Sequence, residues 1–502
     1  MAPKKLITIP PAVTPANFAD AMQQAIALEL ATIPTYLSTY YSINRAQDQD
    51  ALYKKLLGQL AAQSGNSETA DTLAQELKVD ILVYANQSAA LIMSVAIEEM
   101  LHLALSSNVK QAIVQQAPEL LAISKILNFP TQLDGHEPEF PINTAKLTLN
   151  QLSTFLQIES PAPFVDPADK GALDQQVVPY KTIGAFYNDI IACVQANYPG
   201  PYTPVRPQLL PPQKSAPPIP RPYYSQNSIN TVYYDRNHNP QFASTDDGQE
   251  LIGVVDAASA VAAMQEIQHQ GEGNIQPDQT RLIFDPVTKL PVPMPVVDGV
   301  VHFRPGDYDE NGELSHFAKF MEIYSLGGYY QQKFAAIPGL DDFFSYFVTN
   351  MGPNPTQAIY DASGNKPLSL CSQLGNAIFT YILLMIETCY YQDEDTQFAV
   401  FMYGIHKSMI WLLSGIGNSI GGDYTYTNGG QTYAASLTFE YFPFEKQTAR
   451  PKAQILSLVD QLAVADPNNW SWLTQAKYAN YWPSLPDVGL DHSVVPNVPQ
   501  IP

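Results

Sequence analysis

The chain has 502 residues, of which 45% are hydrophobic, so it is long enough to bury a large core. Its 48 acidic and 26 basic side chains give a net charge of −22, which argues against nucleic acid or an anionic membrane as a partner. The three cysteines, Cys193, Cys371 and Cys389, are too few for a disulfide framework or a zinc site, and they indicate a reducing compartment.

The N-terminus predicts no signal peptide, because Pro10, Pro11 and Pro15 interrupt any apolar stretch. The most apolar helix candidate, residues 377–386, is too short to span a bilayer. We therefore predict a soluble, cytoplasmic protein without a membrane partner. The 42 prolines predict long connections between the folded elements.

The first predicted helix covers residues 17–43, where apolar side chains recur at helical spacing around Glu29. Pro34 lies inside this helix and predicts a kink. A shorter helix is predicted at residues 65–77 and a second long one at 88–113. Further along the chain, helices are predicted at residues 148–158, 179–197, 255–270 and 311–326.

Residues 200–224 are rich in proline and predict an extended connection along the surface. After residue 335, Gly429 and Gly430 predict a hairpin turn, and the tail from residue 483 is expected to be irregular. Helices in this part are predicted at residues 341–351, 367–392, 396–416 and 453–464.

Two Glu-x-x-His motifs, Glu99 with His102 and Glu313 with His316, lie in segments that are predicted to be helical. The three-residue spacing places both side chains of a motif on one helical face, one turn apart. One helix can then offer a metal an oxygen and a nitrogen together. Two such motifs, with one carboxylate from each of two other helices, bind two metal ions in ferritin-like bundles.

The N-terminal half offers Glu29 as the additional carboxylate, since it is the only acidic residue between Asp20 and Asp48. Its neighbours are apolar, and a buried carboxylate is costly unless it meets a cation. In the second half the spacing leaves two candidates open, Glu266 and Glu272.

Several neighbouring residues could act on the ligands or replace them. Glu98 could share the face of His102, although the bundle pattern favours Glu99. His269 is either a ligand or a helix-end histidine that caps carbonyl groups. Glu322 could support a ligand from further along the helix of His316.

Tyr36 lies two turns beyond Glu29 on the same helical face and is our candidate catalytic residue, as an electron relay. Simple packing is the favoured alternative, because the chain holds 29 tyrosines.

Four strings of the sequence resemble the ferritin-like domain of the iminophenyl-pyruvate dimer synthase type. They lie at residues 25–37, 95–104, 267–273 and 316–323. That domain is known from enzymes that oxidatively couple tryptophan-derived imines in violacein and rebeccamycin biosynthesis. The resemblance extends over residues 16–161 and 257–328, about half of the chain. The dimer synthases are much longer than this chain, so their coupling activity is not carried over to it.

The resemblance implies a metal-ligand set, and it selects Glu272 over Glu266. The implied ligands are Glu29, Glu99, His102, Glu272, Glu313 and His316. Carboxylates and imidazoles without thiolates suit two Fe ions, with Mn or a mixed Mn/Fe pair as alternatives.

The expected function is that of a di-iron oxidoreductase, an oxidase or oxygenase of secondary metabolism. It would use O2 or peroxide on a small organic, aromatic or amino-acid-derived substrate. One alternative is a ferroxidase or iron-binding protein without an organic substrate. Another is a structural or binding protein that a metal stabilises. Assembly into a homo-oligomer is left open.

The predicted fold is mainly α, a ferritin-like four-helix bundle with long Pro-rich crossover loops and additional C-terminal helices. Residues 1–335 are assigned to the dimetal-binding bundle, with a long insertion at about 118–253. Residues 336–502 are assigned to an additional helical region packed on the bundle.

Overall fold

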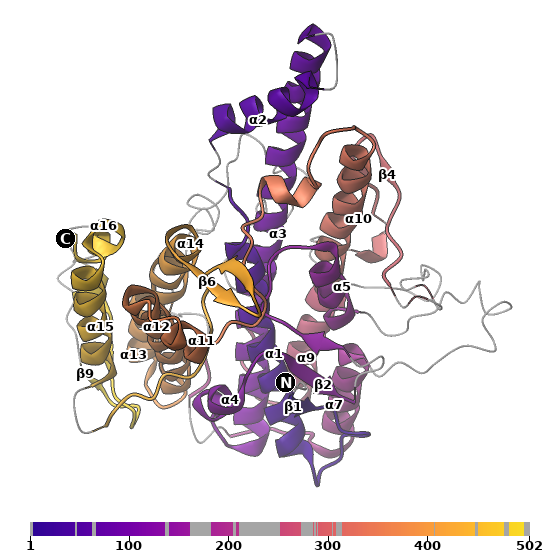
Figure 1. The fold of residues 1–502 in the computed structure, drawn as a ribbon. Coiled ribbons are helices and arrows are strands. Elements are labelled where there is room, and N and C mark those ends of the chain that lie inside the picture. Colours follow the sequence, from indigo (N-terminus) through magenta and orange to yellow (C-terminus); the bar gives the residue numbers. More distant parts are fainter. Residues whose placement is uncertain are drawn as a thin grey trace, which may run out of the picture.

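The computed structural model of the chain is mainly helical, as predicted, with a helical bundle and further helices beside it (Figure 1). It describes residues 4–45, 48–62, 67–135, 140–160, 182–203, 207–209, 251–272, 285, 288, 290–303, 305–307, 314–405, 407–446, 450–475 and 481–495. Most of the predicted proline-rich connection at 200–224 lies outside these residues.

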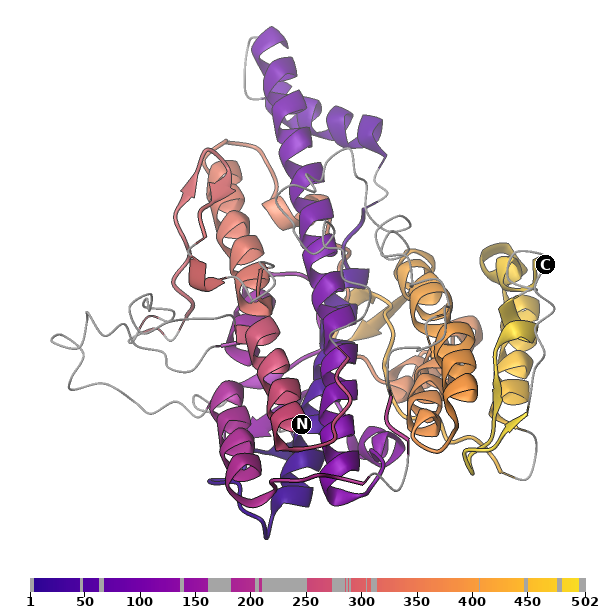
Figure 2. The same cartoon turned by 180° about the vertical axis from the view of Figure 1, so that it is seen from behind.

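The central element is α3 (Ser67–Val114), which runs the length of the molecule and projects beyond the other helices (Figures 1 and 2). It packs against α1 (Phe18–Tyr41), α9 (Ala257–Glu272) and α10 (His316–Ala335). At its projecting end it packs against α2 (Gln49–Ala61), a helix that the sequence patterns did not predict.

Two shorter helices complete the bundle. Helix α5 (Leu149–Ile158) packs on α10, and α7 (Ile183–Asn197) packs on α9 and α1. Thr148 and Thr182 cap these helices, because each side-chain oxygen accepts a backbone N–H of the first turn. The helices α1, α3, α5, α7, α9 and α10 thus surround one common interior.

The C-terminal helices lie on one side of the bundle (Figures 1 and 2). They contact it through α12, which packs on α4 (Leu120–Ile126), and through α14, which packs on α1. These helices are α11 (Gln357–Ala362), α12 (Lys366–Cys389), α13 (Glu394–Ala399), α14 (Ser414–Asp423), α15 (Pro451–Ala465), α16 (Pro467–Trp470) and α18 (Tyr481–Ser484).

The strands are short and lie at the edges of the fold. In the sheet β1 (Lys4–Thr8), β2 (Thr131–Asp134) and β3 (Pro141–Ile142), β1 is parallel and β3 antiparallel to β2. The antiparallel pairs are β4 (Val296–Val297) with β5 (Val300–Val301), β6 (Thr425–Asn428) with β7 (Gln431–Ala434), and β8 (Asp487–Val488) with β9 (Val494–Val495). The predicted turn at Gly429 and Gly430 is confirmed, and both glycines have positive φ.

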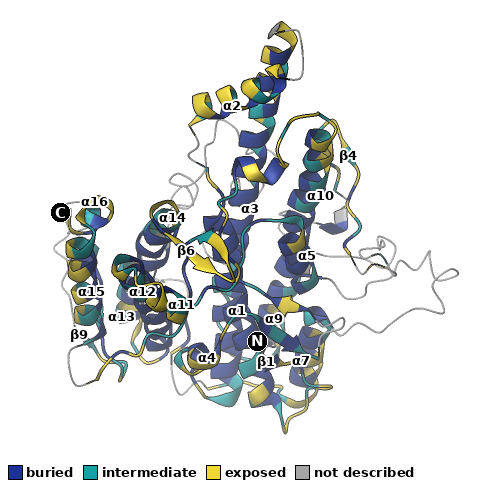
Figure 3. Cartoon of the chain, in the orientation of Figure 1, coloured by how far each residue is buried: buried dark blue, intermediate teal, exposed yellow. Residues whose placement is uncertain are grey.

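Helices α3 and α12 are long and apolar enough to cross a membrane. In the structure, however, 78% and 89% of their most apolar windows are buried against the rest of the chain. Figure 3 shows this burial along α1, α3 and α12. Such burial is that of core helices in a soluble protein.

Two helices that were predicted separately in the N-terminal half form one continuous helix in the structure. The segments at 65–77 and 88–113 belong to the continuous α3, because no proline or glycine interrupts residues 67–114. The helix predicted at 311–326 begins later, at His316, because Ser315 is its N-cap. Glu313, the first residue of the second motif, lies outside the described residues.

The predictions for the C-terminal part were only partly right. Residues 341–351 contain only the 3-10 turn Phe343–Tyr346. Residues 396–416 are divided among α13, two π-helical stretches and α14, a winding that periodicity at 3.6 residues does not reveal. The other 3-10 turns are Pro305–Asp307 and Ser471–Thr474.

Ser315 is the N-cap of α10 and directly precedes His316. Its Oγ accepts the backbone N–H of Ala318 at 3.2 Å, and the residue is fully buried. We expect Ser315→Ala to lower the free energy of unfolding by about 1 kcal/mol, the usual loss for such a cap. Urea unfolding followed by circular dichroism measures this. Ser315→Gly should lose only a few tenths of this amount, and equal losses for both variants would contradict a capping role.

Candidate metal centre

Three buried side chains with metal-ligating atoms come together inside the bundle. They are Glu99, His102 and His316, whose ligand atoms all lie within 4.8 Å of one another. Helix α3 supplies the first two, one turn apart, and the first residue of α10 supplies the third. The structure thus brings together the histidines of both sequence motifs, 214 positions apart.

One side of the cluster is formed around His102. Its Nδ1 lies 3.6 Å from Glu29 Oε2 on α1 and 3.6 Å from Glu99 Oε1. These three predicted residues are buried, with at most 4% of each exposed. A cation between them would have one nitrogen and two carboxylate oxygens as ligands.

The other side is formed around His316. Its Nδ1 lies 3.0 Å from Glu99 Oε1 and 3.5 Å from Glu159 Oε2. The rings of His102 and His316 are stacked, with centroids 5.0 Å apart. Because Glu99 Oε1 faces the Nδ1 atoms of both histidines, its carboxylate belongs to both sides of the cluster.

Glu159 was not among the residues selected from the sequence. It directly follows α5 as the C-cap residue of that helix. A signal was nevertheless present, since Glu159 is the only acidic residue between Glu139 and Asp166 and follows a predicted apolar helix. The same argument of an isolated carboxylate that selected Glu29 would have selected Glu159.

Each of the three carboxylates accepts a hydrogen bond from a buried hydroxyl group. Tyr187 on α7 donates to Glu29 Oε1, and Tyr36 on α1 donates to Glu159 Oε1. Thr32 Oγ1 lies 2.8 Å from Glu99 Oε2 and donates to it. Each carboxylate therefore has one oxygen held by the protein and the other directed at a histidine.

The Nε2 atoms of both histidines also have partners. Gln270 Oε1 lies 3.0 Å from Nε2 of His102, and Gln270 Nε2 donates to Glu266 Oε1 at 2.8 Å. Nε2 of His316 lies 2.8 Å from Glu98 Oε2, which is also 2.5 Å from Lys319 Nζ.

These partners fix a proton on the Nε2 atom of both rings. A carboxylate only accepts hydrogen bonds, and the amide of Gln270 already donates to Glu266, so each Nε2 carries the proton. Each Nδ1 then faces the carboxylates and would direct its lone pair at a cation bound among them. Histidines that ligate metals are oriented in this way, with the second nitrogen donating to an outer acceptor.

The pKa values reflect a concentration of buried charge. Burial and the neighbouring carboxylates Glu159 and Glu29 raise the pKa of Glu99 to about 8. Burial lowers the pKa of His316, but the surrounding carboxylates more than reverse this effect and raise it well above its usual value. Burial also raises the pKa of Glu98, yet Lys319 and His316 bring it down to about 2.

The donor set fits a pair of hard or borderline divalent cations. Nδ1 of His316 is buried and makes no aligned hydrogen bond with any described residue. Three carboxylates in close contact repel one another, and bound cations would remove that repulsion. Oxygen and imidazole ligands without a thiolate suit Fe or Mn. The three cysteines are buried and free, and none is among the grouped ligands.

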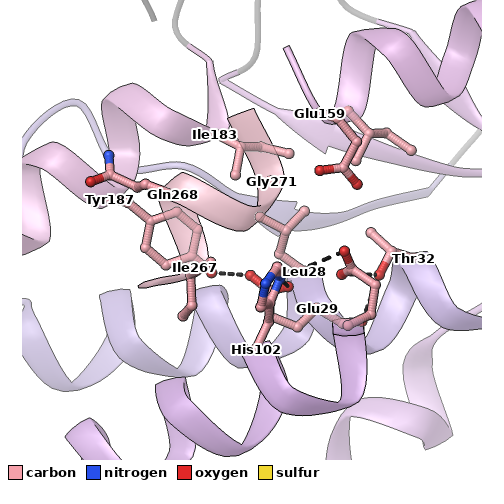
Figure 4. A pocket seen from close by; sticks show the side chains of 12 residues that line it. Leu28, Glu29, Thr32, His102, Glu159, Ile183, Tyr187, Ile267, Gln268 and Gly271 are labelled. Carbon is pink, nitrogen blue, oxygen red and sulfur yellow. Dashed lines mark hydrogen bonds and ion pairs between the residues drawn. The ribbon is translucent and has the colours of Figure 1, made fainter. Parts of the chain in front are cut away.

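A small cavity of about 30 Å³ lies beside the cluster (Figure 4). By this measure the cavity holds about two water-sized molecules. In the figure, Glu29 lies between Tyr187 and His102. Its lining residues are Leu28, Glu29, Thr32, Glu99, His102, Ile158, Glu159, Ile183, Tyr187, Ile267, Gln268 and Gly271.

Two ligands that the resemblance implies cannot be placed. Glu313 and the side chain of Glu272 lie outside the described residues, although the backbone of α9 ends at Glu272. His269 lies on α9 but does not line the cavity. Glu322 accepts a hydrogen bond from Gln87 on α3 at 2.7 Å, and no contact with the cluster is recorded for it among the described residues.

Removing the hydroxyl group that holds Glu29 should weaken metal binding. We expect Tyr187→Phe to lower metal affinity by about 10-fold or more, the usual effect of deleting a hydrogen bond to a ligand. Calorimetric titration of the metal-free protein with Mn(II) measures this. The exposed Tyr329→Phe on α10 is the control. Unchanged affinity in Tyr187→Phe would show that this hydrogen bond is not needed to orient the ligand.

Clusters of carboxylates and histidines inside a helical bundle are typical of dimetal carboxylate proteins. The chain belongs to the Ferritin-like family, whose pattern matches residues 22–325. It is also similar to the crystal structure of a ferritin-like protein from Caulobacter vibrioides, at 16% identity and a TM-score of 0.36. That similarity covers 81% of this chain and 98% of the other. No curated protein sequence matches the chain.

Proposed function

We propose that this protein is a dimetal carboxylate oxidoreductase that uses O2 or peroxide to oxidise a small organic molecule. The single observation that carries the proposal is the convergence of both Nδ1 atoms on three buried carboxylates. Bound iron or manganese ions would supply the electron transfer to the oxidant.

The protein's own residues would orient the ligands and limit access. Tyr187, Thr32 and Tyr36 hold one oxygen of each carboxylate. The apolar side chains of Leu28, Ile158 and other residues line the cavity beside the ligands, which are themselves buried. The cavity has the size of a diatomic oxidant, so a larger substrate would react at its mouth or after it widens.

The contacts of Tyr36 support a positioning role more than electron relay. Its hydroxyl group donates to Glu159, and its ring packs edge-on against Phe155 and tilted against Phe320. A relay requires a partner that loses the electron to the tyrosine. The ring contacts and the hydrogen bond described for Tyr36 join it to Phe155, Phe320 and Glu159, none of which is readily oxidised.

The proposal extends to the relatives, location, substrate and domain organisation of the protein. We propose relationship to the dimer synthase type, action in the cytoplasm, and a small aromatic or amino-acid-derived substrate, without nucleic acid or membrane as a partner. Residues 1–335 would form the metal-binding unit, with an insertion at about 118–253, and residues 336–502 a helical support. Assembly into a homo-oligomer stays open.

The test is anaerobic loading of the metal-free protein with Fe(II), followed by mixing with O2. We expect two ions per chain, a new visible absorption on mixing, and iron that stays bound. The variants Glu99→Ala and His316→Ala should lose both the ions and the absorption. Fewer than one ion per wild-type chain would overturn the proposal. Rapid release of Fe(III) would instead indicate the alternative, a ferroxidase without an organic substrate.

A further inference from the structure

The two histidines of the cluster differ in the group that accepts their Nε2 proton. His316 donates to a carboxylate, Glu98 Oε2, at 2.8 Å. His102 donates to a neutral amide, Gln270 Oε1, at 3.0 Å. The two sides are otherwise alike, since each pairs one histidine with one carboxylate of its own and shares Glu99.

A carboxylate draws the Nε2 proton more strongly than an amide does. The Nδ1 lone pair of the ring then becomes a stronger donor to a metal ion. A hydrogen bond to an ionised acceptor is also roughly twice as strong as one between neutral groups. His316 should therefore bind a metal more tightly, and be held more rigidly, than His102.

Lys319 allows Glu98 to act in this way. A neutral, ligating His316 leaves the carboxylate of Glu98 without a positive partner on that side. Lys319 is 1% exposed, lies one turn after His316 on α10, and places Nζ 2.5 Å from Glu98 Oε2. A lysine so deeply buried needs a compensating anion. The pair therefore keeps Glu98 charged whether or not His316 is.

The partner of His102 has a different arrangement. Gln270 is neutral, and its own amide group donates to Glu266 at 2.8 Å. The negative charge of Glu266 thus lies one residue further from the histidine. The hydrogen bonds from His102 to Gln270 and from Gln270 to Glu266 orient the ring, but the direct partner of its Nε2–H group is uncharged.

We propose that the two metal positions are unequal, and that Glu98 and Lys319 are positioning residues that make the His316 position the tighter one. This inference rests on the proposed binding of two metal ions. It adds the order in which the two metal ions bind. The first ion binds at His316, Glu159 and Glu99, and the second at His102, Glu29 and Glu99.

Titration of the metal-free full-length protein with Co(II), followed by calorimetry and visible absorption, tests this order. The wild type should bind in two steps whose dissociation constants differ by about tenfold or more. Glu98→Gln gives His316 an amide partner like that of His102. We expect this variant to weaken the tighter step by about 10- to 100-fold and to leave the other step unchanged.

Three further variants separate this effect from a general loss of structure. Gln270→Leu should weaken only the weaker step, the reverse of Glu98→Gln. Lys319→Met should weaken the tighter step and shift its Co(II) absorption, whereas Lys319→Arg, which retains the charge, should preserve both. The far-UV circular dichroism of each metal-free variant reports whether the fold is retained.

The outcomes distinguish this inference from the proposed function. Two equal steps in the wild type, or an equal loss at both steps in Glu98→Gln, would overturn the inequality but not the dimetal site. Absence of Co(II) binding to the wild type would overturn both. Loss of the tighter step alone in Glu98→Gln, with a folded protein, would establish the order of loading.

Discussion

Replacement of Glu159 by alanine is expected to lower the metal content from two ions per chain to one. Glu159 is the carboxylate that belongs to the His316 side alone, with Oε2 3.5 Å from Nδ1 of that histidine. Without it, the ion at His316 would keep one nitrogen and the shared oxygen of Glu99, too few ligands for tight binding. Elemental analysis after reconstitution and gel filtration measures the metal content.

A control variant separates this effect from a general change of charge. Glu119→Ala removes an exposed carboxylate on the same molecule and should retain both ions. Glu159→Gln keeps the size of the side chain and the acceptor for Tyr36, yet it should lose the ion as well. If Glu159→Ala still binds two ions, then Glu159 is not a ligand and another residue completes the position.

The stability of the protein is expected to depend on pH through Glu322, which lies on α10 away from the cluster. Burial raises its pKa to about 8 from the usual 4.5, and the hydrogen bond from Gln87 offsets only part of this. Its Oε2 makes no hydrogen bond with any described residue. The folded protein therefore keeps a proton there that the unfolded chain releases near pH 4.5.

This difference in bound protons determines whether stability rises or falls with pH. Between pH 4.5 and about 8 the folded state binds the proton and the unfolded state does not, so stability falls as the pH rises. Glu322→Gln stays neutral and keeps an oxygen acceptor for Gln87. We expect it to unfold with a free energy about 4 kcal/mol higher than the wild type at pH 8, and equal to it near pH 4.

Urea unfolding of the metal-free proteins at several pH values measures the difference. The exposed Glu76→Gln on α3 is the control and should change the free energy of unfolding by no more than about 0.5 kcal/mol at any pH. A difference between Glu322→Gln and the wild type that does not depend on pH would contradict the proton argument. It would point to packing instead.

Local patterns were sufficient for several of the helices and for half of the cluster. Helical periodicity placed α1, α5, α9 and α12 to within a few residues, because an amphipathic or buried helix repeats its apolar side chains every three to four positions. The spacing of Glu99 and His102 predicted their common face for the same reason. The isolation of Glu29 among apolar residues predicted its burial and its need for a cation.

Local patterns were misleading where an end of a helix decided the outcome. Glu313 and His316 have the same spacing as Glu99 and His102, but Ser315 begins α10 after Glu313. A three-residue spacing places two side chains on one face only inside a helix. The cap at Ser315, and not the spacing of the motif, therefore determines that α10 begins at His316.

The sequence by itself determined that this chain is a mainly helical, ferritin-like protein with Glu29, Glu99 and two histidines suited to metal binding. The tertiary structure decided which groups complete the cluster. Glu159 meets Tyr36 across 123 positions of the chain, and His102 meets Gln270 across 168. Contacts at such separations depend on how whole helices pack, and this packing also decides which nitrogen of each histidine faces the carboxylates.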